Sequence, residues 1–396
     1  MKISDRINKM PISSIMELYP IADKRKSEGI TVHHLNIGDP DIKTPREFFD
    51  AIKNYDVETI GYAPARGISE LLDSQRKYYE KFGIIIENED LLITNGGSEA
   101  LIYALLTVAD FGDNILTTEP YYANYTPMFV QTGVEVKTFP TRVEDGFHLP
   151  DKKTITDAID EKTKAILISN PSNPTGVVLT KEELFLLTEI ALEHNLFIIS
   201  DEVYREFIYS DEEYFGFGNI KELEQNLIIV DSISKRFSAC GVRIGSLMSK
   251  NKSVIDGVMS LANARLCVPT IEMIGAAALY NMDLNILKSI NEEYRNRRDY
   301  IISRLKNIPG VTVYEPEGAF YVMPELPVDD ADKFCKWMLK EYSLDDETLM
   351  LATGASFYQN EEKGKSQVRI AYIKGIEVLD KSMSILENAL QEYNSL

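Results

Sequence analysis

Short apolar segments alternate with amphipathic helical segments between residues 90 and 250, and this alternation restricts the fold more than any other feature. The segment 165–169 is apolar at nearly every position, as a strand covered on both faces requires. The alternation predicts an α/β protein with a mostly parallel, doubly wound sheet. Strands are expected at 91–94, 114–118, 134–139, 165–169, 196–200 and 227–230, and an antiparallel or edge strand at 244–248. Helices are expected at 98–109, 122–131 and 181–194.

The rest of the chain predicts a second, smaller α+β unit. A strand is expected at 33–37, and helices at 45–55 and 67–82 lead into the large sheet. After residue 251 come helices at 251–263, 270–281, 284–307, 331–342 and 376–393, with strands near 312 and at 319–322 and 368–372. We therefore expect an N-terminal arm and part of the small domain in 1–45, a large domain in 46–285, and a small C-terminal domain in 286–396.

The charge and cysteine content exclude several classes of protein. The 396 residues carry 62 acidic and 42 basic groups, a formal net charge of −20, which opposes binding to nucleic acid or anionic membranes. The three cysteines lie far apart and the four histidines show no metal-ligand spacing, which favours a reducing compartment and no metal site. Because no signal peptide or membrane-spanning window is found, we expect a cytoplasmic protein.

One lysine follows the strand 227–230 in a turn rich in small hydroxyl residues. Lys235 is an unusual charge for the carboxyl end of a buried strand, unless its amine forms a Schiff base. Burial and a nearby cation would lower the pKa of such an amine, and Arg243, eight residues later, is the expected cation or a phosphate ligand. The alternative is an ordinary surface turn with two basic residues, and this stretch alone does not decide.

Two further turns present polar groups where predicted strands end. In Asn95-Gly96-Gly97-Ser98, glycines at a helix N-terminus let the backbone approach an anion, although Ser98 as a simple N-cap is the common alternative. In the segment 170–176, two Asn-Pro steps present Asn173 at the carboxyl edge of the sheet, where open α/β sheets bind ligands.

The remaining candidates are an acid, several tyrosines and an arginine. Asp201 ends a strand and is placed to bind a protonated ring nitrogen, and Tyr204 is placed to bind a ring oxygen. The aromatic stretch 121–125 offers a ring that can stack on a flat cofactor. Arg369, flanked by apolar residues, requires a planar carboxylate, either an internal one or that of a substrate.

In combination, these groups suit pyridoxal 5′-phosphate. An anionic carboxylate keeps the pyridine nitrogen protonated, so that the ring accepts the electrons of a substrate carbanion. The lysine carries the aldehyde, is released by the incoming amine, and then moves the proton as a general base.

Over residues 5–395 the chain resembles the class I/II aminotransferases of fold type I, and is similar to bacterial and archaeal aspartate aminotransferases. The resemblance implies that Lys235 carries the cofactor, that Asp201 pairs with the pyridine nitrogen, and that Tyr204 and Asn173 bind the ring oxygen. It implies that Tyr122 stacks on the ring. It assigns the phosphate to Gly97, Ser98, Ser232, Ser234 and Arg243.

The same resemblance implies a substrate site and a homodimer. Arg369 matches the arginine that grips the substrate α-carboxylate, with Gly38 and Asn173 beside it. Tyr62 matches a tyrosine that reaches the phosphate of the neighbouring subunit, so two active sites at a dimer interface are expected. The segments 236–240 and 352–358 depart from the common family pattern, and 263–270 corresponds to a substrate-reading region. Arg265, with Arg66 as second choice, is the candidate for a distal carboxylate.

The expected reaction is a ping-pong exchange of an amino group between an L-amino acid, with aspartate favoured, and 2-oxoglutarate. An aminotransferase for aromatic amino acids or alanine is an alternative, as is a C–S β-lyase, which would use the same lysine, aspartate and arginine. A cofactor-binding regulator is disfavoured because no helix-turn-helix precedes the arm, and a nicotinamide dehydrogenase because no G-x-G-x-x-G follows the first strand.

Overall fold

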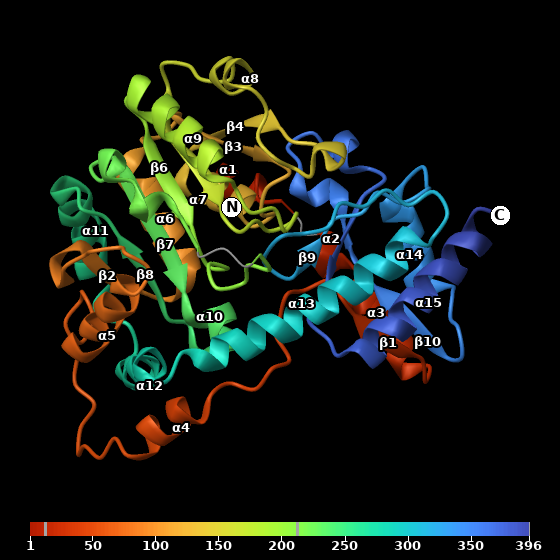
Figure 1. Ribbon diagram of the computed structural model, residues 1–396, viewed down its shortest axis with the longest axis horizontal. Coiled ribbons are helices and arrows are strands. Elements are labelled where there is room, and N and C mark those ends of the chain that lie inside the picture. Colours follow the sequence, from red (N-terminus) through yellow and green to blue (C-terminus); the bar gives the residue numbers. More distant parts are fainter. Residues whose placement is uncertain (12–13, 211–213, 396) are drawn as a thin grey trace.

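A seven-stranded, mostly parallel sheet forms the centre of the computed structural model, which describes residues 1–11, 14–210 and 214–395 (Figure 1). Its order is β2-β8-β7-β6-β5-β3-β4. The predicted α/β class is confirmed, and β8 is antiparallel to both neighbours but lies inside the sheet rather than at an edge. The strands are β2 Leu91–Thr94, β3 Asn114–Glu119, β4 Glu135–Pro140, β5 Thr163–Ser169, β6 Phe197–Asp201, β7 Leu227–Ser232 and β8 Gly245–Met248.

Helices cover both faces of this sheet, because successive strand residues point to opposite sides. In β5, Ile166 and Ile168 pack with α5 (Ser69–Glu80), α9 (Lys181–Glu193) and α12 (Thr270–Asn281). Ala165 and Leu167 pack instead with α6 (Gly96–Val108), α7 (Tyr125–Thr132) and α11 (Lys252–Arg265). Two apolar layers therefore enclose the sheet and fix its strand ends.

The long helix α13 (Asn285–Lys306) runs from the large sheet to a second group of elements (Figure 1). That group contains a three-stranded sheet, β11-β12-β9, and a parallel pair, β1-β10. The strands are β1 Thr31–His34, β9 Tyr321–Val322, β10 Glu347–Met350, β11 Ala352–Thr353 and β12 Val368–Ala371. The helices around them are α3 Tyr19–Ser27, α14 Ala331–Lys340 and α15 Ile376–Tyr393.

The N-terminal segment joins this second group, since β1 pairs with β10 from Thr31↔Glu347 to His34↔Met350. The strand predicted at 33–37 is therefore displaced toward the N-terminus, and β10 was not predicted. Both strands are short, and a partner more than three hundred residues away stabilises them. The division at 1–45, 46–285 and 286–396 stays a prediction.

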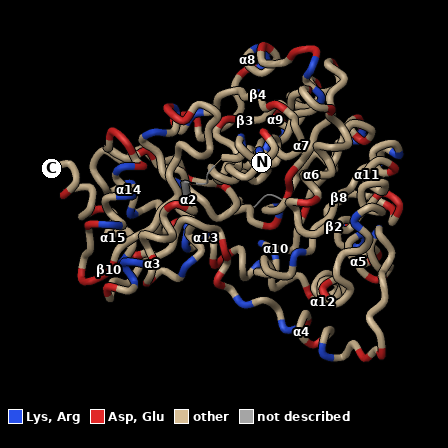
Figure 2. The backbone as a smooth tube through the Cα atoms, turned by 180° about the vertical axis from the view of Figure 1, so that it is seen from behind, with Lys and Arg blue, Asp and Glu red and all other residues tan. Residues whose placement is uncertain are grey.

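The short helices complete the chain: α1 Asp5–Asn8, α2 Ser14–Glu17, α4 Arg46–Lys53, α8 Lys152–Thr156 and α10 Ile233–Arg236. Acidic and basic residues are interspersed over both parts of the molecule (Figure 2). Within the described ranges, no helix combines the length and apolar character needed to cross a bilayer.

Candidate active site

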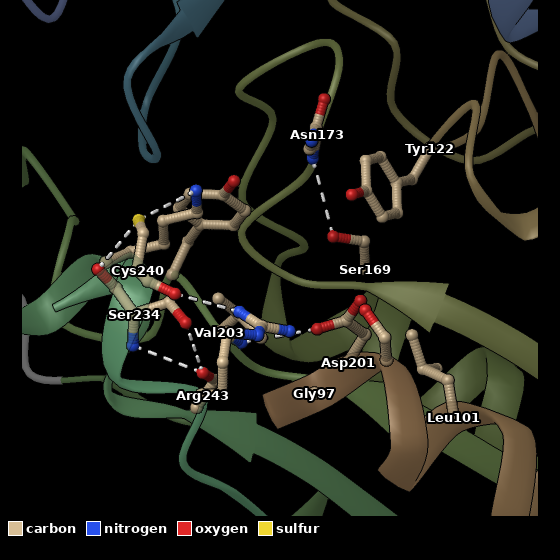
Figure 3. A pocket seen from close by; sticks show the side chains of 14 residues that line it. Gly97, Leu101, Tyr122, Ser169, Asn173, Asp201, Val203, Ser234, Cys240 and Arg243 are labelled. Carbon is tan, nitrogen blue, oxygen red and sulfur yellow. Dashed lines mark hydrogen bonds between the residues drawn. The ribbon is translucent and has the colours of Figure 1, made fainter. Parts of the chain in front are cut away.

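A cavity of about 120 Å³ lies at the carboxyl ends of β5, β6 and β7, beside the N-terminus of α6 (Figure 3). It gathers the residues that the sequence predicted to bind a cofactor within one chain: Gly97, Ser98, Tyr122, Asn173, Asp201, Tyr204, Ser232, Ser234, Lys235 and Arg243. Leu101, Ser169, Val203 and Cys240 also line it and were not predicted. The parallel strands converge at this edge, so residues from distant parts of the sequence meet there.

Lys235 enters the cavity from α10, the short helix that follows β7. The hydroxyl of Ser232 caps this helix by accepting a hydrogen bond from the backbone N–H of Ser234, at 3.1 Å. The Lys235 Nζ donates to the Gly38 carbonyl at 2.7 Å and lies 3.5 Å from the Cys240 Sγ. The amine therefore has specific partners in the protein.

The electrostatics of Lys235 differ from the prediction. Burial by itself lowers the pKa of the Lys235 amine, but the acidic groups of Tyr321, Cys240 and Tyr122 outweigh burial, so the pKa is raised above its ordinary value. The expected lowering by Arg243 is wrong in this arrangement: the guanidinium donates to the Cys240 carbonyl at 2.9 Å. The amine donates its hydrogen bonds to neutral acceptors, the Gly38 carbonyl and the Cys240 Sγ.

Asp201 is the last residue of β6, and its side chain is buried. Its Oδ2 accepts a hydrogen bond from the Tyr125 hydroxyl at 2.8 Å, and Oδ1 accepts from the Val203 N–H at 3.4 Å. Burial raises the pKa of the Asp201 carboxyl to about 6, and these two hydrogen bonds oppose the rise. A protonated ring nitrogen beside it would favour the ionised form.

The N-terminus of α6 forms a cradle with an arginine and two serines. A Cβ added to Gly96 would lie 2.4 Å from the Arg243 Nη2, so glycine lets the guanidinium approach the helix end. The hydroxyls of Ser232 and Ser234 are 2.7 Å apart and face the same cavity. Helix N–H groups, hydroxyls and a guanidinium together suit a phosphate.

Tyr204, which lines the cavity, contacts a tyrosine that sequence analysis missed. The Tyr204 hydroxyl is 2.7 Å from the Tyr321 hydroxyl, and burial raises the pKa of Tyr204. A Cβ on Gly38 would lie 1.9 Å from the Tyr321 oxygen, so only glycine fits there. Tyr122 accepts a hydrogen bond from the Asn124 amide at 2.9 Å. No local motif distinguishes Tyr321, because its neighbours are ordinary core residues.

Arg369 projects from β12 and is only 4 % exposed. Its Nη1 donates to the Asn173 Oδ1 at 2.9 Å and its Nη2 to the Asn36 carbonyl at 2.6 Å, while Nε is buried without a hydrogen-bond partner. Its guanidinium lies 4.5 Å from the Tyr321 ring centre. In the described part of the chain it has neutral oxygens as acceptors and no carboxylate, which leaves capacity for the carboxylate of a ligand.

Tyr62 and Arg265 do not line the cavity of their own chain. The Tyr62 side chain is 85 % exposed. The Arg265 guanidinium lies 3.3 Å from the Glu99 carboxylate and donates to the carbonyls of Ala65 and Ile93. Arg66 is bound to the carbonyls of Glu89 and Leu91. The predicted roles of Tyr62 and Arg265 at a partner's site stay predictions.

The cavity fits pyridoxal phosphate. A glycine cradle with Arg243 suits its phosphate, the carboxylate of Asp201 suits its ring nitrogen, and the Lys235 amine lies in the same cavity. The buried Nε of Arg369 has no hydrogen-bond acceptor, and the carboxylate of a bound substrate would supply one.

Comparisons with known proteins agree with this geometry. The model of the family "Aminotransferase class I and II" matches residues 30–371. An aspartate aminotransferase of Pyrococcus horikoshii is 32% identical over 98% of this chain and 97% of its own length. The crystal structure of an aspartate aminotransferase from Thermotoga maritima superposes with a TM-score of 0.90, at 30% identity over 98% of this chain and 100% of that one. An alanine aminotransferase from Pyrococcus furiosus gives 0.91, at 28% identity over 99% and 100%.

Proposed function

We propose that this protein transfers the amino group of L-aspartate to 2-oxoglutarate. The chain belongs to the family of class I and II aminotransferases. These enzymes use pyridoxal phosphate to exchange amino groups between amino acids and 2-oxo acids. The reaction is a ping-pong exchange at the cavity described above. The aspartate and 2-oxoglutarate specificity rests on similarity to relatives named aspartate aminotransferases.

The roles proposed for the cavity residues are those that the family resemblance implies, and their shared cavity supports them. The cofactor, when bound, supplies an electron sink for the substrate carbanion. Lys235 holds it and moves a proton at the substrate α-carbon, and Asp201 carries the negative charge that keeps its ring nitrogen protonated. Tyr204 and Asn173 bind the ring oxygen of the cofactor, and Tyr122 stacks on the cofactor ring. The cradle of Gly97, Ser98, Ser232, Ser234 and Arg243 binds its phosphate, with Tyr62 of a partner subunit.

The buried guanidinium of Arg369 is the observation that carries the choice of an amino acid as substrate. It has an orphaned Nε and neutral acceptors, so an α-carboxylate would complete its hydrogen bonding. Gly38 makes room for the Tyr321 hydroxyl, and the Asn173 side-chain oxygen accepts a hydrogen bond from the Arg369 Nη1. Because every amino acid has an α-carboxylate, Arg369 would bind all of them and would not distinguish their side chains.

A panel of amino donors tests the substrate. Each donor is mixed with the loaded protein without an oxo acid, and loss of the absorbance of the lysine-bound cofactor is followed. Aspartate is expected to react faster than alanine or phenylalanine. Equal or greater rates with alanine or phenylalanine would contradict aspartate as the preferred donor. Release of pyruvate and ammonia without an oxo acid would identify a β-lyase.

The assembly and location are proposed on two further observations. The segment between α4 and α5 exposes Tyr62 together with Val57 and Ile60, at 85 %, 44 % and 56 %, which supports a homodimer that covers them. The three cysteines are free, which supports a cytoplasmic protein. Light scattering coupled to gel filtration tests the homodimer. A monomeric mass at micromolar concentration would contradict it.

A further inference from the structure

Each of three predicted functional residues is followed directly by a buried charged residue. Asp201, Tyr204 and Lys235 line the cavity, while the residues after them do not. These followers, Glu202, Arg205 and Arg236, are at most 1% exposed. With Asp231 and Glu206 they form a connected cluster, which we call the ionic layer: Glu202, Arg205, Glu206, Asp231 and Arg236.

The contacts of the ionic layer join two segments of the chain. Within 201–206, the Arg205 Nε and Nη2 donate to the Glu202 Oε2 at 3.0 and 2.5 Å. Arg236 donates from Nη2 to both oxygens of Asp231, at 3.0 and 2.8 Å. Two ion pairs cross between the segments. The Arg236 Nε lies 2.8 Å from the Glu206 Oε2, and the Arg205 Nη1 lies 3.8 Å from the Asp231 Oδ2.

Aromatic side chains separate the ionic layer from water. The guanidinium of Arg205 lies 4.5 Å from the Tyr79 ring centre, and that of Arg236 lies 4.8 Å from the Tyr78 ring centre. Tyr79 donates a hydrogen bond to Asp231, and Tyr78 donates one to Glu206. The other phenols that face the layer are Tyr214 and Tyr280. Burial raises the pKa of all four phenols, so they stay neutral at ordinary pH. The Tyr280 hydroxyl accepts a hydrogen bond from the Arg236 Nη1 at 3.0 Å.

Burial of these charges is expensive and calls for a reason. Each buried ion loses several kcal/mol of hydration, and well-packed apolar side chains are often equally stable or more so. Two guanidinium groups and three carboxylates leave the layer with a formal charge of −1. Hydrogen bonds within the layer, such as those from Arg236 to Asp231, give its side chains a fixed orientation that apolar packing does not. The two ion pairs that cross between the segments add an attraction between opposite charges.

The place of the layer supplies that reason. Strands β6 and β7 pair in register only as far as Asp201↔Val230, and the last ladder hydrogen bond runs from the Glu202 N–H to the Val230 carbonyl at 2.9 Å. Beyond this point the two segments have no shared backbone hydrogen bonds in the described chain. The ion pairs of the layer begin where the ladder stops.

We propose that the ionic layer is a positioning device, which locks the segment 201–206 to the segment 231–236 and thereby sets the separation of the Asp201 carboxylate from the Lys235 amine. This rests on the proposed roles of Asp201 and Lys235. Its members are positioning residues, since they contact neither the cavity nor its ligand.

Arg236→Met tests this role, because methionine keeps much of the volume and removes both ion pairs. In the loaded protein, kcat is expected to fall about a hundredfold, as for a reacting group displaced by about 1 Å, while the KM for the amino acid changes less than about twofold. The pH midpoint of the visible band of the lysine-bound cofactor is expected to shift, because the separation of the Asp201 carboxylate from the Lys235 nitrogen changes.

The controls separate positioning from loss of stability. Arg304→Met removes ion pairs with Asp380 and Glu387 in the small part, and is expected to lower the melting temperature with no change of midpoint. If Arg236→Met does not fold, Glu206→Gln is used instead, and its midpoint and kcat are expected to change as well, because the same ion pair between the segments is lost. A folded variant with an unchanged midpoint and kcat would overturn the role of the layer. An unmodified protein without the visible band would refute the assigned site instead.

Discussion

The residues proposed to bind the cofactor and those proposed to bind the substrate come from different parts of the chain. At the cofactor end, Gly97, Ser232, Lys235 and Arg243 all lie at strand or helix ends of the seven-stranded sheet. At the substrate end, Arg369 comes from β12 and Tyr321 from β9, two strands of one short three-stranded sheet, and Gly38 comes from the segment after β1.

This difference indicates that one group of residues carries out the reaction and the other determines which substrate binds. The cofactor end is held by two apolar layers and, beneath it, by the ionic layer, so its groups keep fixed positions. The substrate end depends on contacts between distant segments, such as those that Arg369 makes with Asn173 and Asn36. We expect changes at the first end to abolish the reaction and changes at the second to alter which substrate binds.

The largest effect is expected for Lys235→Ala. Removal of the amine that holds the cofactor and moves the proton should lower kcat by about four orders of magnitude. Borohydride treatment followed by mass spectrometry should then find no labelled peptide from 233–243. Lys250→Ala, which removes only a surface ion pair with Glu224, serves as the control. Retained labelling at another residue would contradict the assignment.

A hundredfold effect confined to the substrate is expected for Arg369→Lys. The charge stays but the forked geometry is lost, so kcat/KM for every amino acid should fall by about two orders of magnitude. Cofactor affinity, measured by dialysis of the loaded protein, should be unchanged. Arg298→Lys, another largely buried arginine of the small part, controls for packing. A matching loss of cofactor would show that the two ends are not separable.

A selective effect of about tenfold is expected for Arg265→Ala. If Arg265 reads the distal carboxylate at a partner's cavity, kcat/KM for aspartate should fall while that for alanine stays the same. Arg66→Ala is the matched comparison, since Arg66 is the second candidate. An equal change for aspartate and alanine would exclude Arg265 from substrate selection and leave it as the structural partner of Glu99.

The smallest effect concerns a contact between the two parts of the molecule. Hydrogen bonds to Glu183 and Glu317 raise the pKa of His148 to about 10. A pKa raised on folding stabilises the protein fully below the unfolded value of about 6.5, and this stabilisation is lost as the pH rises through 10.

His148→Gln should therefore lower the free energy of unfolding by about 1 kcal/mol near neutral pH. Urea denaturation of both proteins should show the difference shrinking as the pH approaches 10. A difference that is constant across this range would mean that packing, rather than charge, accounts for it.

Long elements and strand-end motifs were predictable because each is a local pattern. The strand β2 and helix α12 lie where periodicity predicted them, and the cavity gathers the polar turns that follow the strands. The β1–β10 pairing and the position of β8 inside the sheet were not predictable, since both depend on partners far away in the sequence.

The residues missed at the site share a physical reason. Tyr321 and Cys240 acquire their roles from the neighbours that folding brings to them, namely Tyr204 and Lys235. The direction of the Lys235 pKa shift was mispredicted for the same reason, because it depends on which groups surround the amine in space.

The sequence alone predicted the family and the cofactor, which the comparisons confirm, and a set of polar residues that the structure gathers in one cavity, because the turn after each strand carries its own chemistry. Only the tertiary structure decided what lies behind those residues. Five charged side chains that look like surface residues in the sequence are buried together, because the ends of two neighbouring strands turn them to the side away from the cavity.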